Sequence, residues 1–224
     1  MMKIAVLVSG KGTNLQSIID AIETGILNVE IAVVISNNPK AFALKRAKDH
    51  NIPTEIVANN AFPSREEYDQ KVVDIVTSRE VELVVLAGFM RIITATLINA
   101  FPAGIMNIHP ALLPAFPGLH VQRKAIEYGV KFSGATVHFV DEGVDTGPII
   151  IQAILPVHDD DTEETLAARI LEEEHRIYPQ AIRLFAEGRL EVEGRRVVVK
   201  GGRPPTGAME NPAVAIEPTT NNLL

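Results

Sequence analysis

The segment KIAVLVSGKGTN, residues 3–14, decides the fold class. It opens with an almost continuous apolar run, which is typical of a strand buried on both faces of a sheet. The Gly-rich stretch that follows suits a tight turn, and residues 15–25 repeat their apolar side chains at helical spacing. The segment therefore predicts a strand, a tight turn and a helix in direct succession.

The same succession repeats through the first half of the chain. Buried strands are predicted over residues 29–36 and 82–87, with a short strand at 54–57. Amphipathic helices are predicted over residues 41–50 and 64–80, the second capped by the hydroxyl of its first residue, a serine. Repeated strand–helix–strand units build a parallel sheet, so we expect an α/β fold whose mostly parallel, twisted sheet carries helices on both faces.

The second half changes character. Strands are predicted over residues 105–109, 135–142 and 149–155, helices over 121–128 and 162–186, and a hairpin over 189–200 that turns at Glu193-Gly194. Proline lacks a backbone N–H, so Tyr178-Pro179 predicts a break or kink inside the long helix. Residues 201–224 are rich in Gly, Pro, Thr and Asn without periodicity. We expect them to be a mobile tail that follows a single domain over residues 1–200.

Composition excludes several classes of protein. The net charge of −7 argues against a nucleic-acid binder, which needs a basic face. Zero Cys excludes disulfides and thiolate chemistry and fits a reducing compartment. The N-terminus lacks the features of a signal peptide, and no apolar run approaches the length of about 18 residues that spans a membrane. We therefore expect a cytoplasmic protein with no membrane partner.

The Gly-rich turn has two interpretations. Exposed backbone N–H groups at a helix start favour an anion, and small residues let a phosphate approach closely. The turn has neither the spacing of a Walker loop nor the third glycine of the dinucleotide fingerprint. Alternatively it is only a tight turn, with Thr13 or Asn14 capping the helix. The turn by itself does not decide between them.

A second polar feature is NIHPALLP, residues 107–114. Residues two apart in a strand project to one face, so Asn107 and His109 are expected to point together. Ligands of a parallel sheet bind outside the carboxyl ends of its strands, where this pair is predicted to lie. An isolated His at this place is more often tied to the backbone for structural reasons.

A polar loop, residues 141–148, supplies a carboxylate for that pair. Asp145 is the candidate, because a carboxylate beside an imidazole favours the protonated ring and fixes its orientation. An amide, an imidazole and a carboxylate together suit carbonyl chemistry, with two groups binding an oxyanion and one managing protons. A metal site is the rival, but no HxH or HExxH pair is present. His138 could line the same cleft, although a structural role is the simpler expectation.

Four stretches in register resemble one known family. They are SGKGTNLQ (9–16), AGFMRI (87–92), NIHPALLPAFPG (107–118) and GATVHFVDEGVDTGPII (134–150). Together they resemble phosphoribosylglycinamide formyltransferase, over residues 3–190. The resemblance implies a formyltransferase fold with a Rossmann-like N-terminal half. It also implies transfer of a formyl group from the cosubstrate 10-formyltetrahydrofolate to the amine of N1-(5-phosphoribosyl)glycinamide in purine biosynthesis.

The resemblance also implies residue roles. Asn107, His109 and Asp145 match the catalytic trio. The residues that match the ribonucleotide site are Gly12, Thr13, Asn14 and Glu174. The folate pocket is matched by Arg65, Met90, Arg91, Ile92, Ile93, Asn107, Asp141, Glu142, Gly143, Val144 and Asp145. The family uses no metal, and its partners are small molecules; the chain is expected to be a monomer or a homodimer. The Leu113-Pro114 peptide is commonly cis in the family, which sequence does not reveal.

Other functions compete with this one. A formyltetrahydrofolate hydrolase or another folate-dependent formyltransferase, such as the methionyl-tRNA enzyme, shares the folate half of the fold. A phosphate-binding module without catalysis would use the Gly-rich turn but leave the polar trio unexplained. An NAD-dependent oxidoreductase is disfavoured, because Ser36-Asn37-Asn38 stands at the end of the second strand where an acid is expected.

Overall fold

The computed structural model describes residues 1–203, 206–207, 209 and 211. Its strands are β1 (Met2–Val8), β2 (Val29–Ser36), β3 (Thr54–Ile56), β4 (Leu83–Leu86), β5 (Ile105–His109), β6 (Phe132–Phe139), β7 (Ile149–Pro156), β8 (Leu190–Glu193) and β9 (Arg196–Val199). Its helices are α1 (Thr13–Glu23), α2 (Phe42–Asp49), α3 (Arg65–Ser78), α4 (Ala95–Ala100), α5 (Val121–Tyr128) and α6 (Glu163–Ala186). In this part of the chain all strands join one sheet, in the order β3-β2-β1-β4-β5-β6-β7-β9-β8.

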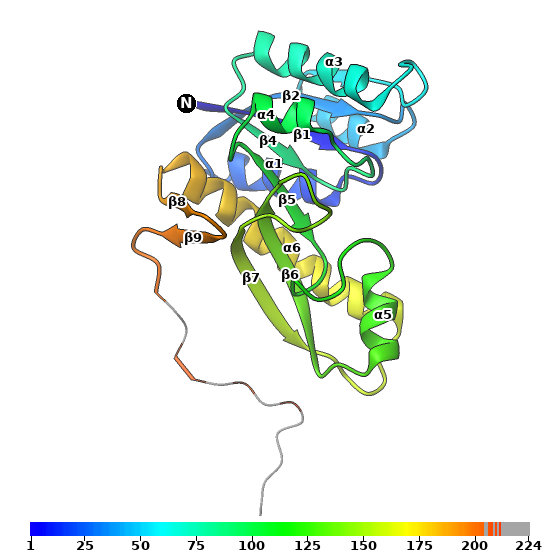
Figure 1. Ribbon diagram of the computed structural model, residues 1–224, viewed down its shortest axis with the longest axis vertical. Coiled ribbons are helices and arrows are strands. Elements are labelled where there is room, and N and C mark those ends of the chain that lie inside the picture. The colour runs from blue at the N-terminus through cyan, green and yellow to red at the C-terminus, as the bar shows by residue number, and fades with distance from the viewer. Residues whose placement is uncertain (204–205, 208, 210, 212–224) are drawn as a thin grey trace, which may run out of the picture.

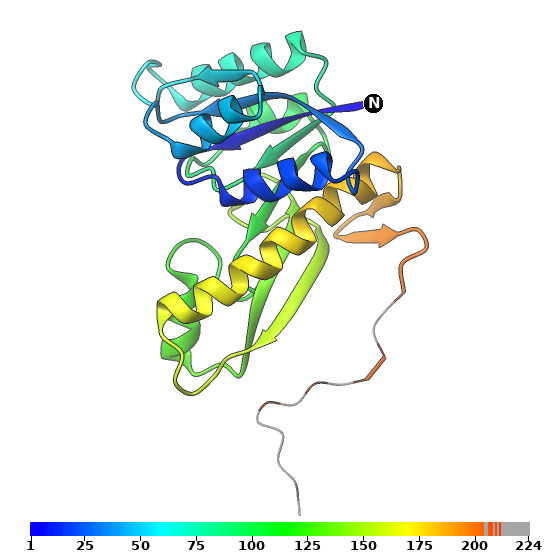
Figure 2. The same cartoon turned by 180° about the vertical axis from the view of Figure 1, so that it is seen from behind.

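The first five strands in that order form the parallel half of the sheet. Alternate side chains of β1 enter different cores: Ile4 and Val6 pack beneath α1, α2 and α6, whereas Ala5 and Leu7 pack beneath α3 and α4. Figures 1 and 2 show these helices on opposite faces. A strand apolar at every position is buried on both sides, which is why the apolar run predicted the layered α/β fold correctly.

The second half of the sheet reverses direction. Strand β6 runs antiparallel to β5, with Asn107 opposite His138 and His109 opposite Thr136, and β7 runs antiparallel to β6. The predicted bounds of β6, residues 135–142, were wrong, because the strand begins at Phe132 and ends at Phe139. Its first residues pair with the end of β7, and its early end has a local cause, since Gly147 packs directly against the carbonyl group of Phe139.

Helix α6 is continuous from Glu163 to Ala186, so the chain does not break at Pro179. The turns on both sides of the proline are fully buried against the sheet at Ile177, Tyr178 and Ala181. This packing holds the helix together despite the hydrogen bond that a proline cannot donate. The Tyr178 hydroxyl group also lies 2.9 Å from the carbonyl oxygens of both Leu86 and Met106, which anchors the helix to β4 and β5.

The remaining elements are a short helix, α4, and the C-terminal hairpin of β8 and β9. Helix α4 was not predicted, because its six residues are too few to display a helical repeat. The hairpin of β8 and β9 turns between Glu193 and Arg196, as predicted. The expected tail, residues 201–224, lies mostly outside the described residues. Among the helices described, none has the length and apolar character that crossing a membrane requires.

Candidate active site

A hollow of about 510 Å³ opens where β4 and β5 end. Three segments far apart in the chain form its walls: the turn after β4, the end of β5 with the segment that precedes α5, and the loop between β6 and β7. Its lining residues are Leu86, Gly88, Phe89, Met90, Arg91, Ile92, Ile93, Asn107, Ile108, His109, Pro110, Gly118, Leu119, His120, Val121, Gln122, His138, Val140, Asp141, Gly143, Val144 and Asp145. Polar groups therefore gather in a hollow with largely apolar walls, as in small-molecule sites.

The amide of Asn107 is oriented by a histidine on the neighbouring strand. His138 Nδ1 lies 2.7 Å from the carbonyl oxygen of Phe139, which can only accept, so Nδ1 carries a proton. Burial lowers the pKa of His138, which favours the neutral ring with an unprotonated Nε2. Nε2 then accepts from Asn107 Nδ2 at 3.2 Å. The second N–H of that amide group is left for another acceptor.

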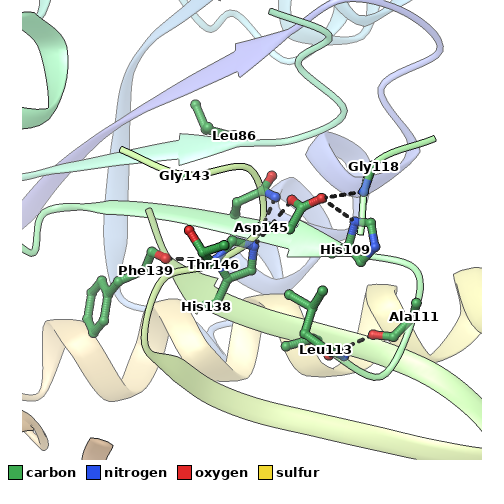
Figure 3. A network of polar contacts seen from close by, with 12 residues as sticks. Leu86, His109, Ala111, Leu113, Gly118, His138, Phe139, Gly143, Asp145 and Thr146 are labelled. Atoms are coloured by element: carbon green, nitrogen blue, oxygen red, sulfur yellow. Dashed lines mark hydrogen bonds and ion pairs between the residues drawn. The ribbon is translucent and has the colours of Figure 1, made fainter. Parts of the chain in front are cut away.

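The ring of His109 lies between two acceptors, the carbonyl oxygen of Phe116 and the carboxylate of Asp145, and Figure 3 shows its contact with Asp145. Its Nε2 donates to the carbonyl oxygen of Phe116 at 2.9 Å, and its Nδ1 lies 3.3 Å from Asp145 Oδ2. A ring protonated on both nitrogens satisfies both contacts. The same carboxylate oxygen accepts from the backbone N–H of Gly118 at 2.8 Å. His138 Nε2 is 3.8 Å from Asp145 Oδ1, too far for a hydrogen bond, and a neutral ring forms no ion pair.

The loop that carries Asp145 is folded tightly on itself. Asp141 Oδ1 accepts from the Thr146 hydroxyl at 2.5 Å and from the Gly143 N–H at 3.1 Å. A side chain at Gly143 would collide with Thr146, so glycine is required there. Asp145 itself has φ +56°, a left-handed conformation that Asp tolerates better than most residues. Local constraints thus direct its carboxylate toward His109.

The segment after β5 is braced by a threonine of β6. The Thr136 hydroxyl donates to the carbonyl oxygen of Ala111 at 2.6 Å and accepts from the Leu113 N–H at 3.1 Å. The Leu113-Pro114 peptide that follows is cis. This brace turns the chain so that the carbonyl oxygen of Phe116 reaches His109. The N–H of Gly118 reaches Asp145, as Figure 3 shows.

In the Gly-rich turn between β1 and α1, neither Thr13 nor Asn14 caps the helix. Gly12 is the N-cap residue with φ +70°, and no side chain caps the helix, so the expectation that Thr13 or Asn14 does so was wrong. A Cβ at Gly12 would lie 2.5 Å from the Cβ of Ala43, a space that only glycine leaves open. The amide of Asn14 instead donates to Glu174 Oε2 at 2.9 Å. The first N–H groups of α1 are therefore not capped by a side chain of their own turn.

Glu174 is a buried carboxyl group, with 6% of the residue exposed. Burial raises its pKa to about 7, and the hydrogen bond from Asn14 opposes that rise only partly. The Asn14 Oδ1 atom is buried without a hydrogen-bond partner among the described residues. The turn after β1 and the middle of α6 thus form one polar contact between the two helices.

The structure separates the expected site residues into two groups. Those that line the hollow are Met90, Arg91, Ile92, Ile93, Asn107, His109, Asp141, Gly143, Val144 and Asp145. Those outside it are Arg65, Glu142, Gly12, Thr13, Asn14 and Glu174. Arg65 is exposed at the first residue of α3, and Glu142 is exposed at the rim of its loop. Thr13 lines a second, more open hollow between α1 and α6.

Several residues of the hollow had no assigned role in the sequence. His138 is the clearest, since the alternation of β6 does not reveal that its ring contacts Asn107. Phe116 and Gly118 contribute only backbone groups, which every residue has, so the sequence cannot single them out. Within the described part of the chain, no three His, Cys, Asp or Glu side chains are arranged to hold a metal ion.

Comparison with known proteins identifies the family. The formyl transferase family model matches residues 2–182. The chain is 43% identical over 207 residues to phosphoribosylglycinamide formyltransferase of Escherichia coli, covering 92% of this chain and 98% of that protein. It is 48% identical over 190 residues to the trifunctional purine biosynthetic protein adenosine-3 of Drosophila pseudoobscura, but spans only 14% of that protein's length and 84% of its own.

A solved structure agrees. Glycinamide ribonucleotide transformylase 1 from Symbiobacterium toebii superposes with a TM-score of 0.88 at 52% identity, covering 89% of this chain and 94% of that one. The fold, the polar trio in the hollow and these similarities lead to one assignment: the chain belongs to the formyl transferase family, alongside the phosphoribosylglycinamide formyltransferases.

Proposed function

We propose that the protein transfers the formyl group of 10-formyltetrahydrofolate to the amine of N1-(5-phosphoribosyl)glycinamide. The observation that carries the proposal is the convergence of Asn107, His109 and Asp145 in one hollow, at the edge of a sheet whose first strand leads into a helix without a side-chain cap. Transfer of this kind needs an oxyanion donor, a proton carrier and two bound substrates. The hollow contains candidates for the first two, and we assign the substrates to the hollow and to the turn before α1.

The substrate amine attacks the formyl carbon in its neutral form. As the new C–N bond forms, the carbonyl oxygen becomes an alkoxide. We assign its stabilisation to the second N–H of Asn107 and to the positive charge of a protonated His109 ring, whose own N–H groups face Phe116 and Asp145. Loss of one such donor costs about 3 to 4 kcal/mol of barrier in comparable sites. His138 holds that amide in the donating orientation before substrate arrives, because it accepts the other N–H at 3.2 Å.

Collapse of the tetrahedral intermediate breaks the bond between the formyl carbon and N10 of the folate. N10 is a poor leaving group unless it is protonated, so the proton that the amine loses must be delivered there. Asp145, 3.3 Å from His109 Nδ1, is assigned to receive the amine's proton directly or through water and to keep the ring charged. General acid–base help of this kind contributes about a hundred- to ten-thousand-fold in rate.

We assign the two substrates to different parts of the protein. We assign the folate to the hollow, against the turn of residues 90–93 and the loop of residues 141–145, whose walls are largely apolar. We assign the phosphate of the ribonucleotide to Gly12, Thr13 and Asn14, where the N–H groups at the start of α1 favour an anion. Glu174 is assigned to the ribonucleotide, because it already contacts Asn14. Arg65 and Glu142 keep only the support of the family resemblance.

We further propose that residues 1–200 act as one formyltransferase domain, since all described strands share one sheet and α6 packs against both α1 and β6. Its N-terminal half would hold the ribonucleotide and its C-terminal half the folate. We also propose that the protein works in the cytoplasm as a monomer or homodimer, with small molecules rather than nucleic acid as its partners and without a bound metal.

The deciding experiment follows loss of 10-formyltetrahydrofolate by absorbance, with and without the ribonucleotide. Transfer predicts that the folate reacts only when the ribonucleotide is present, with one formylated ribonucleotide formed for each tetrahydrofolate. Equal reaction without the ribonucleotide, with release of formate, would instead identify a hydrolase.

A further inference from the structure

A closed set of hydrogen bonds joins the ends of β1, β2 and β4. The Ser9 hydroxyl donates to Asn37 Oδ1 at 2.6 Å and accepts from the Met90 N–H at 2.8 Å. Asn37 Nδ2 donates to Asn59 Oδ1 at 3.0 Å, and Arg91 donates to the same oxygen at 2.6 Å. Because Met90 and Arg91 are neighbours, the contacts close into a circuit, which we call the polar ring.

The polar ring holds the middle of a turn that is anchored in the core at both ends, by Phe89 and Ile93. Met90 is 67% exposed and Ile92 57% exposed, although both line the hollow. Their side chains therefore contribute few buried apolar contacts that could fix the turn. Arg91 is held by Asn59 on one side and stacks over the ring of Tyr68, 3.8 Å from its centroid. Polar contacts thus hold Met90 and Arg91, the part of this wall that the core does not bury.

Asn37 is the centre of the ring and is 6% exposed. Its side chain is the only one in the ring whose two polar atoms each bond a different strand end: the oxygen accepts from Ser9 after β1, and the nitrogen donates to Asn59 after β3. An ionised Asp could not donate to Asn59. This explains why an amide, rather than an acid, follows β2 at this position: Asn37 links the segments that follow β1 and β3.

We propose that Ser9 and Asn37 are positioning residues that fix the Met90–Arg91 turn for the folate, acting through Met90 N–H and Asn59 without touching substrate. The inference rests on the proposed function for the identity of the ligand. The backbone of Ser9 is held separately, by the N–H···O bond to Gly88 at 3.2 Å and by the Asn38 amide at 3.3 Å. Removal of the ring's side chains should therefore displace the folate wall more than the phosphate turn.

Adjacent asparagines provide the matched control. Asn37→Ala breaks the ring, whereas Asn38→Ala removes a similar amide that contacts Ser9 O but no member of the Met90–Arg91 turn. In steady-state assays Asn37→Ala should raise the KM for 10-formyltetrahydrofolate about tenfold while the KM for the ribonucleotide stays within about twofold of wild type. Asn38→Ala should leave the folate KM within about twofold of wild type.

A second pair tests the circuit itself. Ser9→Ala should raise the folate KM as Asn37→Ala does. Ser9→Thr keeps a hydroxyl group, so its folate KM should stay near that of wild type. In the double variant Ser9→Ala/Asn37→Ala, the rise in folate KM, expressed as free energy, should be smaller than the sum of the two single rises. Equal effects of Asn37→Ala on both KM values, additive costs in the double variant, or an equal effect of Asn38→Ala on the folate KM would overturn the proposal.

Binding measurements test the positioning role of Ser9 and Asn37 independently of formyl transfer. Titration of each folded variant with tetrahydrofolate, the product, reports the folate wall without any chemistry, and urea unfolding reports stability separately. If wild type binds tetrahydrofolate but transfers no formyl group, the proposed function fails while the comparison of Asn37→Ala with Asn38→Ala still decides the positioning role. Unchanged tetrahydrofolate affinity in a folded Asn37→Ala protein would reject that role.

Discussion

His138 Nε2 lies 3.2 Å from Asn107 Nδ2, across the antiparallel pair of β5 and β6. Since the other ring nitrogen donates to the carbonyl oxygen of Phe139, this contact fixes both the tautomer of the histidine and the orientation of the amide. The proposed oxyanion donor, Asn107, is therefore oriented by a neighbour that need not touch substrate. The contact depends on register, because a slip of one residue would turn His138 to the other face of the sheet.

His138→Phe should keep the ring volume and remove the acceptor for Asn107. The amide then loses its fixed orientation, so we expect kcat to fall about tenfold or more with little change in either KM. Steady-state kinetics with both substrates, on protein shown to be folded by circular dichroism, tests this. A fall confined to KM would mean that His138 shapes the hollow rather than the donor.

His109→Ala and Asp145→Asn should each lower kcat by about a hundred- to ten-thousand-fold, because each removes a partner in proton transfer. Ribonucleotide affinity, measured by calorimetry, should change little, since neither residue lies at the phosphate turn. Asp159→Asn is the control: this carboxylate forms an exposed ion pair with Lys131 outside the hollow. Wild-type turnover in the His109 or Asp145 variant would remove that residue from the mechanism.

Gly12→Ala should disturb the phosphate turn. The new Cβ would meet Ala43 at 2.5 Å in a backbone conformation that L residues rarely adopt, so we expect a stability loss of about 1 to 3 kcal/mol and weaker binding of the ribonucleotide. Gly10→Ala adds the same methyl group two residues earlier, where nothing lies within 4 Å. Urea unfolding and calorimetry on both variants should separate them, and equal behaviour would show that the turn tolerates a side chain.

Glu174 should make stability depend on pH. Its pKa of about 7 in the folded protein exceeds the ordinary value of 4.5, so between these values the folded state retains a proton that the unfolded state releases. Relative to Glu174→Gln, wild type should therefore lose up to about 3 kcal/mol as pH rises from about 4.5 to about 7, and no more above that. Urea unfolding of both proteins across this range is the measurement, and a constant difference would contradict the buried, neutral carboxyl group.

Phosphate binding at α1 has a direct test in Thr13→Ala. We expect weaker ribonucleotide binding and unchanged tetrahydrofolate binding, because Thr13 lies outside the hollow that contains Asn107 and His109. Calorimetric titration with each ligand makes the comparison. Unchanged ribonucleotide affinity would place the phosphate elsewhere.

The parallel half of the fold could be predicted because its rules are local. Residues 3–8 are apolar at nearly every position, and that pattern alone requires cover on both faces of the sheet. Pairs separated by two residues in a strand, such as Asn107 and His109, follow from the pleat. The reversal at β6 was only partly predictable, since its bounds depend on how Gly134 and Gly147 pack against distant carbonyl groups.

The parts of the site that escaped prediction are those made by tertiary contacts. Whether His138 supports the core or orients Asn107 depends on which residues face each other across two strands, which no local pattern encodes. The capping of α1 was mispredicted because Asn14 finds Glu174, 160 residues later in the chain, instead of its own helix. Continuity at Pro179 likewise depends on burial of Tyr178, not on the proline itself.

Helix α6 contacts the elements on which both proposed substrate sites stand. Figure 2 shows α6 running beside α1 and across the back of the sheet. Asn14 at the head of α1 donates to Glu174, and one turn later the Tyr178 hydroxyl group bonds the carbonyl groups of Leu86 at the end of β4 and of Met106 in β5. Neither half can open without separating from this helix. Amide protons in β1 and in β6 should therefore exchange with solvent at the same free energy of opening, equal to that of global unfolding.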